Sequence, residues 1–511
     1  MSGEPEAICL RLHPRDNVVV ALQPVGAGWV VRTEAGEVRA RQEIKPGHKL
    51  AIRPIKKGES VVKYGCPIGR ATRDIDPGEW VHEHNLATAL EERADREFVY
   101  RPKPADPRRE EGHEEAAAVF AGYRRPDGRV GTRNEVWILP TVSCVNTTAR
   151  RLAERAQPLL TRFPAVDGVY AFPHALECSQ GRPDQEPLRR LLANLINHPN
   201  AGGVLVLSLG CEVNHPDALR PYLGRYDPRR VKFLVTQEVA DELEAGLRLV
   251  EELLKYAGQC SREPVPAREL KVGLKCGGSD AFSGLTANPL VGRVADRLVG
   301  AGGTAVLTEL PELFGAETFL LDRAQDLEVF EALRRTIAAF HRYFRQRGLP
   351  IYGKDNPSPG NKEGGITTLE EKALGGLHKA GSAPVTGVLG YGDRLERPGL
   401  NLLGAVPDDL TSITALAACG CQLVLFTTGR GTPVGTCVPT IKISSRSELF
   451  ASKPGWIDFD AGRLARGEPM AALADELWEL VLAVASGKKT RAEEGGYREV
   501  AFPQDWPEAV T

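Results

Sequence analysis

Four cysteines each follow a short apolar run that reads as a β-strand, and this shared position is the first sign of chemistry in the chain. In open α/β sheets, ligands bind in the crevice outside the carboxyl ends of the strands. Thiolates suit iron and other soft or borderline metals, so the pattern favours a common polar or metal site over isolated cysteines that pack as small apolar residues. The four are Cys144 after VWILPTV, Cys178 after VYAFP, Cys211 after VLVLSLG and Cys276 after LKVGL.

Other polar residues follow the same apolar runs. The carboxylates Glu212, Asp280 and Glu309 are rival ligands if the metal is manganese or magnesium, because those ions prefer oxygen. Ser279 and Asn146 occupy equivalent positions and could bind substrate. The order of residues along the chain does not say which of these groups converge.

A glycine-rich turn, GRGTPVGT at residues 429–436, follows the apolar run LVLFTT. Gly429 and Gly431 permit a close backbone approach, and free N–H groups beside Arg430 suit an anionic oxygen. The turn matches neither a Walker loop nor GxGxxG, so it does not indicate nucleotide binding. A simple tight turn is the alternative. Lys442, in the next apolar run, is a further candidate for binding a substrate carboxylate.

Two histidines near the end of the first hundred residues, His82 and His84 in WVHEHN, are two positions apart. On an extended strand such residues share one face, so the pair could bind a divalent cation or reach a substrate. Exposed histidines are common, and an ordinary surface pair is the alternative.

The elements that would position these residues alternate between strand and helix from Gly122 onward. Near-continuous apolar strands that alternate with helices predict parallel sheets covered on both faces, an α/β body. The expected strands are 136–141, 166–173, 202–210, 231–236, 270–274, 304–309, 385–390 and 423–428, and the expected helices between them include 146–160, 187–198, 216–223 and 241–257.

The front of the chain has a different pattern. Short β-like runs separated by Gly and Pro turns predict a small, mostly β domain over 1–88. Residues 89–121 are charged and contain prolines, which is typical of a linker. The catalytic body would then span 122–511, with a possible division into two subdomains near 262–270.

Composition excludes several classes of protein. The 511 residues carry a net charge of −2 with both signs interspersed, so nothing indicates a nucleic-acid partner. No apolar run is long enough to cross a bilayer and the start does not resemble a signal peptide, so we expect a cytoplasmic protein without a membrane partner. The ten cysteines include no CxxC pair. We interpret Cys9, Cys66, Cys260, Cys419 and Cys421 as packing residues and leave Cys437 undecided.

A set of ordered motifs resembles the altronate dehydratase and galactarate dehydratase family of sugar-acid lyases. The motifs are GYRRPDGRVGTRNEVWILPTVSCVN, HALECSQ, LGCEVN, KCGGSDAFSGLTANP, TELPELFGAE, NPSPGNKEGGITTLEEKALG, YGDRLERPGLNLL, FTTGRGTPVG and WIDFDAG. The segment from DNVVVALQPV to WVHEHN resembles the small β-clip domain, called SAF, that precedes the body in those enzymes. The amino-acid sequences of these motifs are most similar to those of the altronate-acting members.

This resemblance implies dehydration of a hexonate, D-altronate losing water to give 2-keto-3-deoxygluconate, with iron(II) or manganese(II) as the cofactor. One departure stands out. Family members commonly read Leu-Gly-Cys-Thr-Gln-Lys where this chain has Leu-Gly-Gly-Leu-His-Lys at 374–379, so Gly376 replaces a cysteine.

The implied reaction removes the hydrogen beside the carboxylate and expels the neighbouring hydroxyl. A bound metal would stabilise the enolate-like charge as a Lewis acid. His174, His378, Lys379, His82 and His84 are the candidates for the base and the acid. Arg430, Lys442 or Lys379 would hold the substrate carboxylate.

Several alternatives remain open at this point. The same fold could act on galactarate or another aldarate, or on a sulfolactate. Three or four convergent cysteines could instead hold an iron–sulfur cluster. The chain could also be a non-catalytic sugar-acid sensor whose thiols pack in the core. In each case a small molecule is the partner; a homodimer is an ordinary expectation for a metabolic enzyme, and the SAF-like domain could act as a lid.

Overall fold

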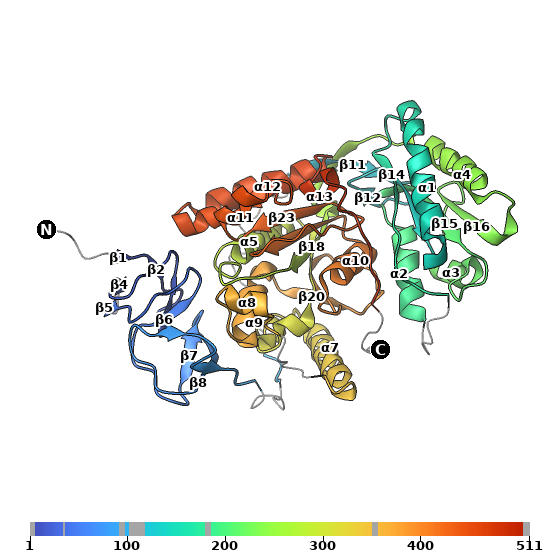
Figure 1. Cartoon of the computed structure of the whole chain (residues 1–511). Coiled ribbons are helices and arrows are strands. Elements are labelled where there is room, and N and C mark those ends of the chain that lie inside the picture. Colours follow the sequence, from blue (N-terminus) through green and yellow to red (C-terminus); the bar gives the residue numbers. More distant parts are fainter. Residues whose placement is uncertain are drawn as a thin grey trace.

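The computed structural model describes residues 6–33, 36–90, 98–101, 118–178, 185–349 and 356–503. Its N-terminal domain, blue in Figure 1, consists of short strands joined by tight turns. Gly28, Gly47, Gly58 and Gly78 each close such a turn at positive φ, a conformation that glycine adopts without strain. The strands are β1 (Glu6–Ala7), β2 (Cys9–Leu10), β3 (Val18–Ala21), β4 (Val30–Thr33), β5 (Gly36–Arg39), β6 (Lys49–Ala51), β7 (Ser60–Lys63), β8 (Cys66–Ala71), β9 (Trp80–Val81) and β10 (Leu86–Ala87).

These strands form three small sheets, in the orders β2-β3-β6-β9, β1-β4-β5 and β10-β8-β7. Val18, Val19 and Val20 of β3 are all buried because β3 lies between the other strands of this domain. The prediction of a mostly β N-terminal domain is confirmed. Much of the predicted linker, residues 91–97 and 102–117, lies outside the described segments.

The body contains two parallel sheets. The first, in the order β14-β13-β15-β16, forms the second lobe, on the right of Figure 1. Helices α1 and α4 pack together on one face of it and α2 and α3 on the other. The elements are β13 (Glu135–Pro140), α1 (Asn146–Ala156), β14 (Gly168–Ala171), α2 (Glu186–Ile196), β15 (Ala201–Ser208), α3 (Pro216–Leu223), β16 (Val231–Val235) and α4 (Glu242–Ala257).

The second parallel sheet has seven strands in the order β20-β21-β19-β18-β22-β23-β24 and forms the third lobe, at the centre of Figure 1. Helices α5 and α12 cover one face, and α10 packs against β18 and β22. The strands are β18 (Lys271–Cys276), β19 (Thr304–Leu307), β20 (Val385–Leu389), β21 (Gly399–Leu403), β22 (Leu423–Thr428), β23 (Thr440–Ser444) and β24 (Phe459–Asp460). Both sheets confirm the predicted α/β body.

The remaining helices surround this sheet. They are α5 (Ala287–Gly300), α6 (Glu317–Leu321), α7 (Leu327–Gln346), α8 (Pro359–Glu363), α9 (Leu369–Leu377), α10 (Asp409–Cys419), α11 (Ser447–Ser452), α12 (Met470–Ala485) and α13 (Arg491–Glu494). Thr368 is the N-cap residue of α9, and its side chain accepts a hydrogen bond from the Glu371 amide. Glu371 lies in the first turn of α9, and its side chain contacts Lys49 and Lys63 of the N-terminal domain.

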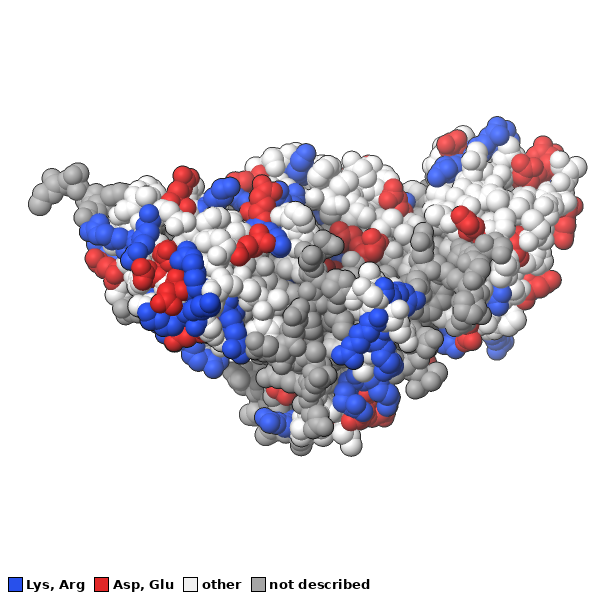
Figure 2. Space-filling model, turned by 60° about the horizontal axis from the view of Figure 1, so that its bottom comes forward, with Lys and Arg blue, Asp and Glu red and all other residues white. Residues whose placement is uncertain are grey.

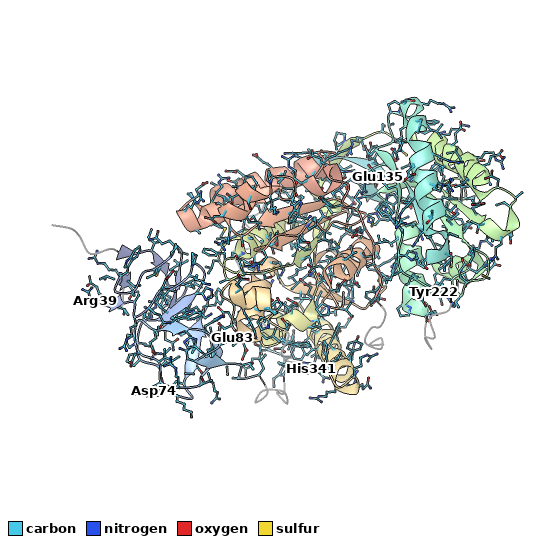
Figure 3. The ribbon with its side chains drawn as sticks, in the orientation of Figure 1. Arg39, Asp74, Glu83, Glu135, Tyr222 and His341 are labelled. Atoms are coloured by element: carbon cyan, nitrogen blue, oxygen red, sulfur yellow. The ribbon has the colours of Figure 1, made fainter. Side chains whose placement is uncertain are left out.

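Paired strands and packed helices connect the two lobes of the body. Strands β11 (Val119–Arg124), β12 (Val130–Gly131) and β17 (Glu263–Pro266) form a small antiparallel sheet between them, so the chain near 262–270 passes from one lobe to the other through paired backbone. Helix α2 packs on α10 across the boundary. Glu135, at the start of β13, accepts two hydrogen bonds from Arg498 at 2.9 and 2.7 Å (Figure 3).

The N-terminal domain docks on the body through buried charges. Lys49 and Lys63 both contact the Glu371 carboxylate of α9, each at 2.8 Å, and all three side chains are almost fully buried. At the rim, Lys362 pairs with Glu83 at 2.5 Å (Figure 3). Separating the domain would leave these charges without partners, and breaking a buried pair costs about 3–5 kcal/mol.

The outer surface mixes both signs of charge. Lysines, arginines and acidic residues intermingle over the N-terminal domain in Figure 2, which shows one face of the molecule. Among the helices that are described, none is long and apolar enough to cross a membrane.

Candidate functional site

The polar residues predicted at strand ends divide between the two parallel sheets. Cys276, Ser279, Asp280 and Glu309 lie at the carboxyl edge of the seven-stranded sheet, where β18 and β19 end. The other three cysteines of the prediction, with Glu212, lie at the edge of the four-stranded sheet. A single site built from all four cysteines is therefore not what the fold brings together.

A pocket at the seven-stranded edge collects groups from distant parts of the chain. Its lining includes Asp280 and Glu309 from the strand exits, Lys379 from the turn after α9, and Lys63 and Tyr64 from the N-terminal domain. The strand-end position explains the first pair, because ligand crevices open there in α/β sheets. The N-terminal domain therefore completes this pocket with its own side chains.

Asp280 is the most unusual group in the pocket. Its side chain is 1% exposed. One oxygen, Oδ1, accepts hydrogen bonds from the Ser283 amide at 2.9 Å and the Ser445 hydroxyl at 2.8 Å, whereas Oδ2 is buried and bonds to no described residue. Burial raises the pKa of this carboxyl. A buried oxygen without a donor is costly, which makes Oδ2 a candidate to meet a substrate group or an ion.

The exits of β18 and β19 are tied together by a buried ion pair. Lys275 contacts both Glu309 and Asp409, the latter at 2.8 Å, and the second Glu309 oxygen accepts from the Cys276 amide at 3.2 Å. Glu309 adopts a left-handed backbone with φ of 69°. Such strain persists where the surroundings impose it, and here the two bonds to its carboxylate do so. Cys276 itself is buried, 2.6 Å from the Ser279 hydroxyl.

The remaining charges of the pocket are mostly paired. Glu312 contacts Lys372 at 2.7 Å, and Glu371 holds Lys63. Lys379 is 3% exposed and lies in the field of Glu309 and Glu312. No ion pair within 4.0 Å joins it to a carboxylate in the part of the chain that the structure describes. Lys379 and Asp280 are thus the cation and the anion that the pocket leaves available.

Tyr64 enters the pocket from the tight turn between β7 and β8. It is one of the non-glycine residues with positive φ, at 59°. Its hydroxyl lies against Gly284 and Gly375, and a Cβ at Gly284 would overlap it. The Lys63 ammonium lies 4.8 Å from the centre of its ring. Burial raises the pKa of the Tyr64 phenol, and the Lys63 charge opposes that rise.

Gly376, which replaces the cysteine common in the resembling family, also lines this pocket. A Cβ built there would lie 3.7 Å from the Lys379 ammonium and 3.8 Å from Leu313, both ordinary contact distances. The backbone thus accommodates a small side chain at this position, and no neighbouring residue depends on its being glycine.

The edge of the four-stranded sheet gathers the other three cysteines. The sulfur atoms of Cys144 and Cys178 are 3.5 Å apart, and the Gln237 amide donates to the Cys211 sulfur at 3.7 Å. Cys144 and Cys211 are exposed and Cys178 is half-buried. Glu212 beside them accepts hydrogen bonds from Thr141, from Ser208 at 2.5 Å and from the Gly210 amide at 2.8 Å.

His174 and His378, which were predicted as base or acid candidates, lie outside the pocket lining. Both ring nitrogens of His174 bond to backbone, Nε2 donating to the Pro140 carbonyl at 2.7 Å and Nδ1 accepting from the Leu176 amide at 3.2 Å. Burial lowers its pKa to about 4. Asn146 holds the same loop by donating to the His174 carbonyl at 2.7 Å. The ring of His378 meets that of Tyr64 edge-on, 5.3 Å between centres, behind the pocket.

The histidine pair of the N-terminal domain does not reach the pocket lining. His82 is buried at the domain interface, where its Nδ1 lies 2.9 Å from the Thr367 hydroxyl, and burial lowers its pKa to about 4. His84 is exposed and its ring tilts against Trp80. The prediction that the two histidines bind a cation or reach the substrate is not tested by these contacts and stays a prediction.

The glycine-rich turn borders the pocket rather than opening into it. A side chain at Gly429 would overlap Asp280, so this glycine makes room for the buried carboxylate. The Gly431 amide donates to Thr428, and Arg430 pairs with Glu363 at 2.7 Å on the surface. Lys442 is fully buried near the ring of Tyr497, and its ammonium bonds to no described residue; burial lowers its pKa to about 8.

The donors at the two sheet edges differ in how they suit a metal. Within the described ranges, no group of three or more His, Cys, Asp or Glu side chains is spaced to hold a metal ion. In the pocket, Glu309, Glu312 and Glu371 already pair with lysines, so a manganese or magnesium ion would find only Asp280 Oδ2. The pocket carboxylates thus fit a preformed oxygen-ligated site poorly, whereas the exposed thiols are chemically suited to iron.

Several residues of the pocket, and Lys275 beside it, were not found from the sequence, although Lys275 carried a signal. Lys275 lies between Leu274 and Cys276 in a strand whose pattern is otherwise apolar, so a buried partner was predictable for it. Lys63, Tyr64 and Glu371 gave no comparable signal, because they meet only when the N-terminal domain packs on α9. Lys372 gave none either, because it meets Glu312 only when α9 packs on the turn after β19.

Comparisons with known proteins agree with these observations. The family described as D-galactarate/Altronate dehydratase, C-terminal, matches residues 267–508. The family described as D-galactarate dehydratase/Altronate hydrolase, second domain, matches 122–258, and the Altronate/galactarate dehydratase SAF domain matches 7–89. Altronate dehydratase of Escherichia coli is 47% identical over 96% of this chain and 98% of its own length. The Bacillus subtilis altronate dehydratase is 46% identical over the same shares.

A third relative, the E. coli galactarate dehydratase (L-threo-forming), is 34% identical over 95% of this chain and 94% of its own length. All three similarities extend from the N-terminal domain through both parallel sheets. The resemblance inferred from the motifs is confirmed, and the chain belongs to the altronate and galactarate dehydratase family of carbon–oxygen hydro-lyases.

Proposed function

We propose that this protein dehydrates a hexonate sugar acid, and that its substrate is D-altronate, which yields 2-keto-3-deoxygluconate. The higher identity to altronate dehydratases, 47% and 46%, than to a galactarate dehydratase, 34%, supports this choice. The structural observation that carries it is the pocket in which Asp280 and Lys379 remain without charged partners among the described residues. An anionic polyol would satisfy both.

The reaction breaks two bonds of the substrate. A base takes the hydrogen from C2, and the electron pair of that C–H bond forms the C2–C3 double bond as the C3–O bond breaks. The departing hydroxyl takes a proton and leaves as water, and the resulting enol tautomerises to the 2-keto acid. A group that accepts a proton and a group that donates one are therefore both required.

Asp280 is suited to be the acceptor. Its Oδ1 is fixed by Ser283 and Ser445, so Oδ2 keeps a defined direction. A raised pKa makes this carboxylate a stronger base than an exposed aspartate. Lys379 supplies the positive charge that holds the substrate carboxylate beside it.

Tyr64 is suited to be the donor. Its phenol stays protonated at neutral pH because burial raises its pKa. As the proton leaves, the neighbouring Lys63 charge stabilises the phenolate that forms. Both residues come from the N-terminal domain, so this domain contributes to the chemistry and does more than cover the pocket.

Other predictions from the sequence remain proposals. We keep iron as the proposed cofactor, with manganese as the alternative. The carboxylates Glu309, Glu312 and Glu371 of the pocket already pair with lysines, so we assign the two proton transfers of the dehydration to Asp280 and Tyr64 and not to a metal. A homodimer in the cytoplasm remains the expected state of the protein.

The experiment incubates the purified full-length protein, supplied with ferrous ion under reducing conditions, with D-altronate or galactarate. Keto-acid formation is measured with a carbonyl reagent. We expect turnover of altronate to exceed that of galactarate and to be lost in Lys379→Met. Faster turnover of galactarate would make the aldarate the substrate, and no turnover of either acid would support the sensor alternative.

A further inference from the structure

A second cavity lies between the two lobes of the body, and we call it the interlobe cavity. Its volume of about 550 Å³ lies within the range of about 300–1,000 Å³ that small-molecule sites occupy. The second lobe contributes α2 and Tyr222 (Figure 3), and the third lobe contributes β20, the turn after it and the first turns of α7 (Figure 1). None of the described residues lines both this cavity and the pocket of Asp280.

Arg394 is the arginine of the interlobe cavity that has no carboxylate partner. The other arginines of the described lining are paired. Arg190 contacts Glu186 at 2.6 Å, and Arg397 contacts Glu328 at 2.8 Å. Arg394 is exposed and forms no ion pair with a carboxylate in the part of the chain that the structure describes. Because a guanidinium binds carboxylates through paired hydrogen bonds, Arg394 is the cation that an anionic ligand would find free.

A buried amide fixes the direction of the Arg394 side chain. The Arg394 Nε donates to Asn194 Oδ1, and Nη2 donates to the Ala193 carbonyl at 3.5 Å. Asn194 is 7% exposed and is itself held, because its Nδ2 donates to the Gly392 carbonyl at 2.8 Å. The remaining nitrogen, Nη1, donates to none of the described residues. A ligand carboxylate would therefore meet an arginine that is already oriented, which lowers the entropic cost of binding.

Asn401 supplies the cavity with an acceptor that has no donor. Asn401 is 1% exposed and lines the cavity. Its Nδ2 donates to the carbonyls of Arg397 at 2.9 Å and Gly399 at 3.2 Å, which fixes the orientation of the amide. Oδ1 receives no hydrogen bond from a described residue, and a Cβ at Gly387 would overlap it. Glycine at 387 therefore keeps space beside this oxygen, and a ligand hydroxyl would supply the missing donor.

The free groups of the cavity define the class of ligand. Arg394 can only donate hydrogen bonds and therefore selects an anion. Asn401 Oδ1 and the exposed carboxylate of Glu396 can only accept, so they select hydroxyl groups. A molecule with one carboxylate and several hydroxyls meets both requirements. A phosphate monoester matches less well, because its two negative charges would face a single free arginine.

We propose that the interlobe cavity is a second, non-catalytic binding site for a polyhydroxy carboxylate, the class of compound to which sugar acids belong. Arg394 holds the carboxylate, and Asn401 and Glu396 receive the hydroxyl groups. A ligand in this position contacts α2 on one side and the turn after β20 on the other, so it joins the two lobes and stabilises their packing. The proposal does not rest on the dehydration reaction.

The test counts binding sites in the full-length protein after the Asp280 pocket has been disabled. The variant Lys379→Met is titrated by calorimetry with D-gluconate and, separately, with D-altronate. We expect saturable binding of at least one acid at one site per chain, with Kd below about 1 mM, and a higher melting temperature when the acid is bound. The absence of saturable binding by both acids would overturn the proposal.

Three further ligands test the chemistry assigned to the site. Sorbitol has the hydroxyls without the carboxylate, hexanoate has the carboxylate without the hydroxyls, and glucose 6-phosphate carries a phosphate in place of the carboxylate. Each should bind at least about tenfold more weakly than the better of the two sugar acids, because each loses one set of charge-assisted or neutral hydrogen bonds. Equal or tighter binding of any of the three would contradict the assigned class of ligand.

Matched variants locate the site. Arg394→Gln, added to Lys379→Met, should weaken binding of the sugar acid by at least about tenfold, with the melting temperature of the ligand-free protein unchanged because the side chain is exposed. Arg334→Gln removes an exposed arginine of α7 that pairs with Glu331 and lies outside the cavity lining, so it should bind as its parent does. Equal affinity in the two variants would overturn the proposal.

Discussion

The seven-stranded and the four-stranded sheets end in different chemistry at their carboxyl edges. At the seven-stranded edge the charged groups are buried, and lysines pair with Glu309, Glu312 and Glu371. At the four-stranded edge one carboxylate is buried among hydrogen-bond donors; of the thiols near it, those of Cys144 and Cys211 are exposed and that of Cys178 is half-buried.

The difference arises from what covers each edge. Helix α9 and the N-terminal domain close over the seven-stranded sheet. Lys372 of α9 pairs with Glu312, and Lys63 of the N-terminal domain pairs with Glu371 of α9, whereas the lysine that pairs with Glu309 comes from the sheet itself. A buried charge without such a partner is expensive, so the covered edge selects paired charges. A topological position at a strand end therefore predicts that polar groups will be present, and the covering element decides which of them remain available.

The largest effect should follow loss of the available carboxylate at the covered edge. Asp280→Asn removes the proposed base, and we expect kcat to fall by about 10²–10⁴-fold with a melting temperature close to that of the unmodified protein. Steady-state kinetics and thermal unfolding measure the two. Ser445→Ala is the control, since it removes a bond to Oδ1 and keeps the carboxylate. A variant with normal kcat would exclude Asp280 as the base.

A large effect on stability should follow when the buried ion pairs of Glu371 with Lys49 and Lys63 are broken. Glu371→Gln leaves Lys49 and Lys63 buried without their anion, which should cost about 3–5 kcal/mol of unfolding free energy. Denaturant unfolding measures it. Glu363→Gln removes an exposed partner of Arg430 and should cost less than about 1 kcal/mol. Equal effects of the two changes would mean that the buried cluster contributes no more than a surface pair.

The same cluster should give a defined response to acid. Burial raises the pKa of Glu371, but the two lysines outweigh it and lower the pKa from 4.5 to about 2. Because the folded-state pKa is the lower one, the stabilisation is present above pH 4.5 and is lost as pH falls toward 2. Unfolding free energy measured across this range should fall less steeply in Glu371→Gln. An unchanged slope would contradict the shifted pKa.

A smaller loss of turnover should follow removal of the Tyr64 hydroxyl. Tyr64→Phe keeps the ring between Gly284 and Gly375 and removes the proposed acid, so kcat should fall by about 10²-fold, the lower end of the range for proton transfer, with KM little changed. Phe282→Leu, an apolar change at a buried side chain two residues before Gly284, is a control for disturbed packing. If Tyr64→Phe raised KM alone, the hydroxyl would bind substrate without donating a proton.

The smallest effect should come from the exposed histidine. His84→Ala should change stability by less than about 0.5 kcal/mol and leave turnover unchanged, because the side chain contacts Trp80 on the surface. His82→Ala removes a buried contact to Thr367 and should destabilise more. Loss of turnover in His84→Ala would restore the original expectation that the pair serves the reaction.

Much of the fold was predictable because parallel strands are apolar over their whole length. The sequence segments that form β13, β15, β18 and β22 are nearly continuous apolar runs, and each was predicted as a strand. Strand β21 and the long helix α7 were not predicted; Asn401 interrupts the apolar run of β21, and arginines interrupt the α7 sequence.

The site was predictable only in part. Asp280 and Glu309 were found from their position after strands, which is a local property of the sequence. The contribution of Lys63 and Tyr64 depends on contacts across more than 300 residues of chain, such as that between Lys63 and Glu371. No local pattern encodes a contact of that kind, whereas the His82 and His84 pair is visible in the sequence; its role stays a prediction.

The buried contact between Glu371 and its two lysines also bears on how the chain tolerates being cut. The N-terminal domain is held to the body by side chains, including the Thr88 hydroxyl bond to Glu370 at 2.9 Å, and not by the peptide connection alone. A nick in that connection would remove only the high effective concentration that a tether provides. Two separately made fragments should accordingly reassociate into a working protein at sufficient concentration, so the covalent link serves mainly to keep the stoichiometry at one to one.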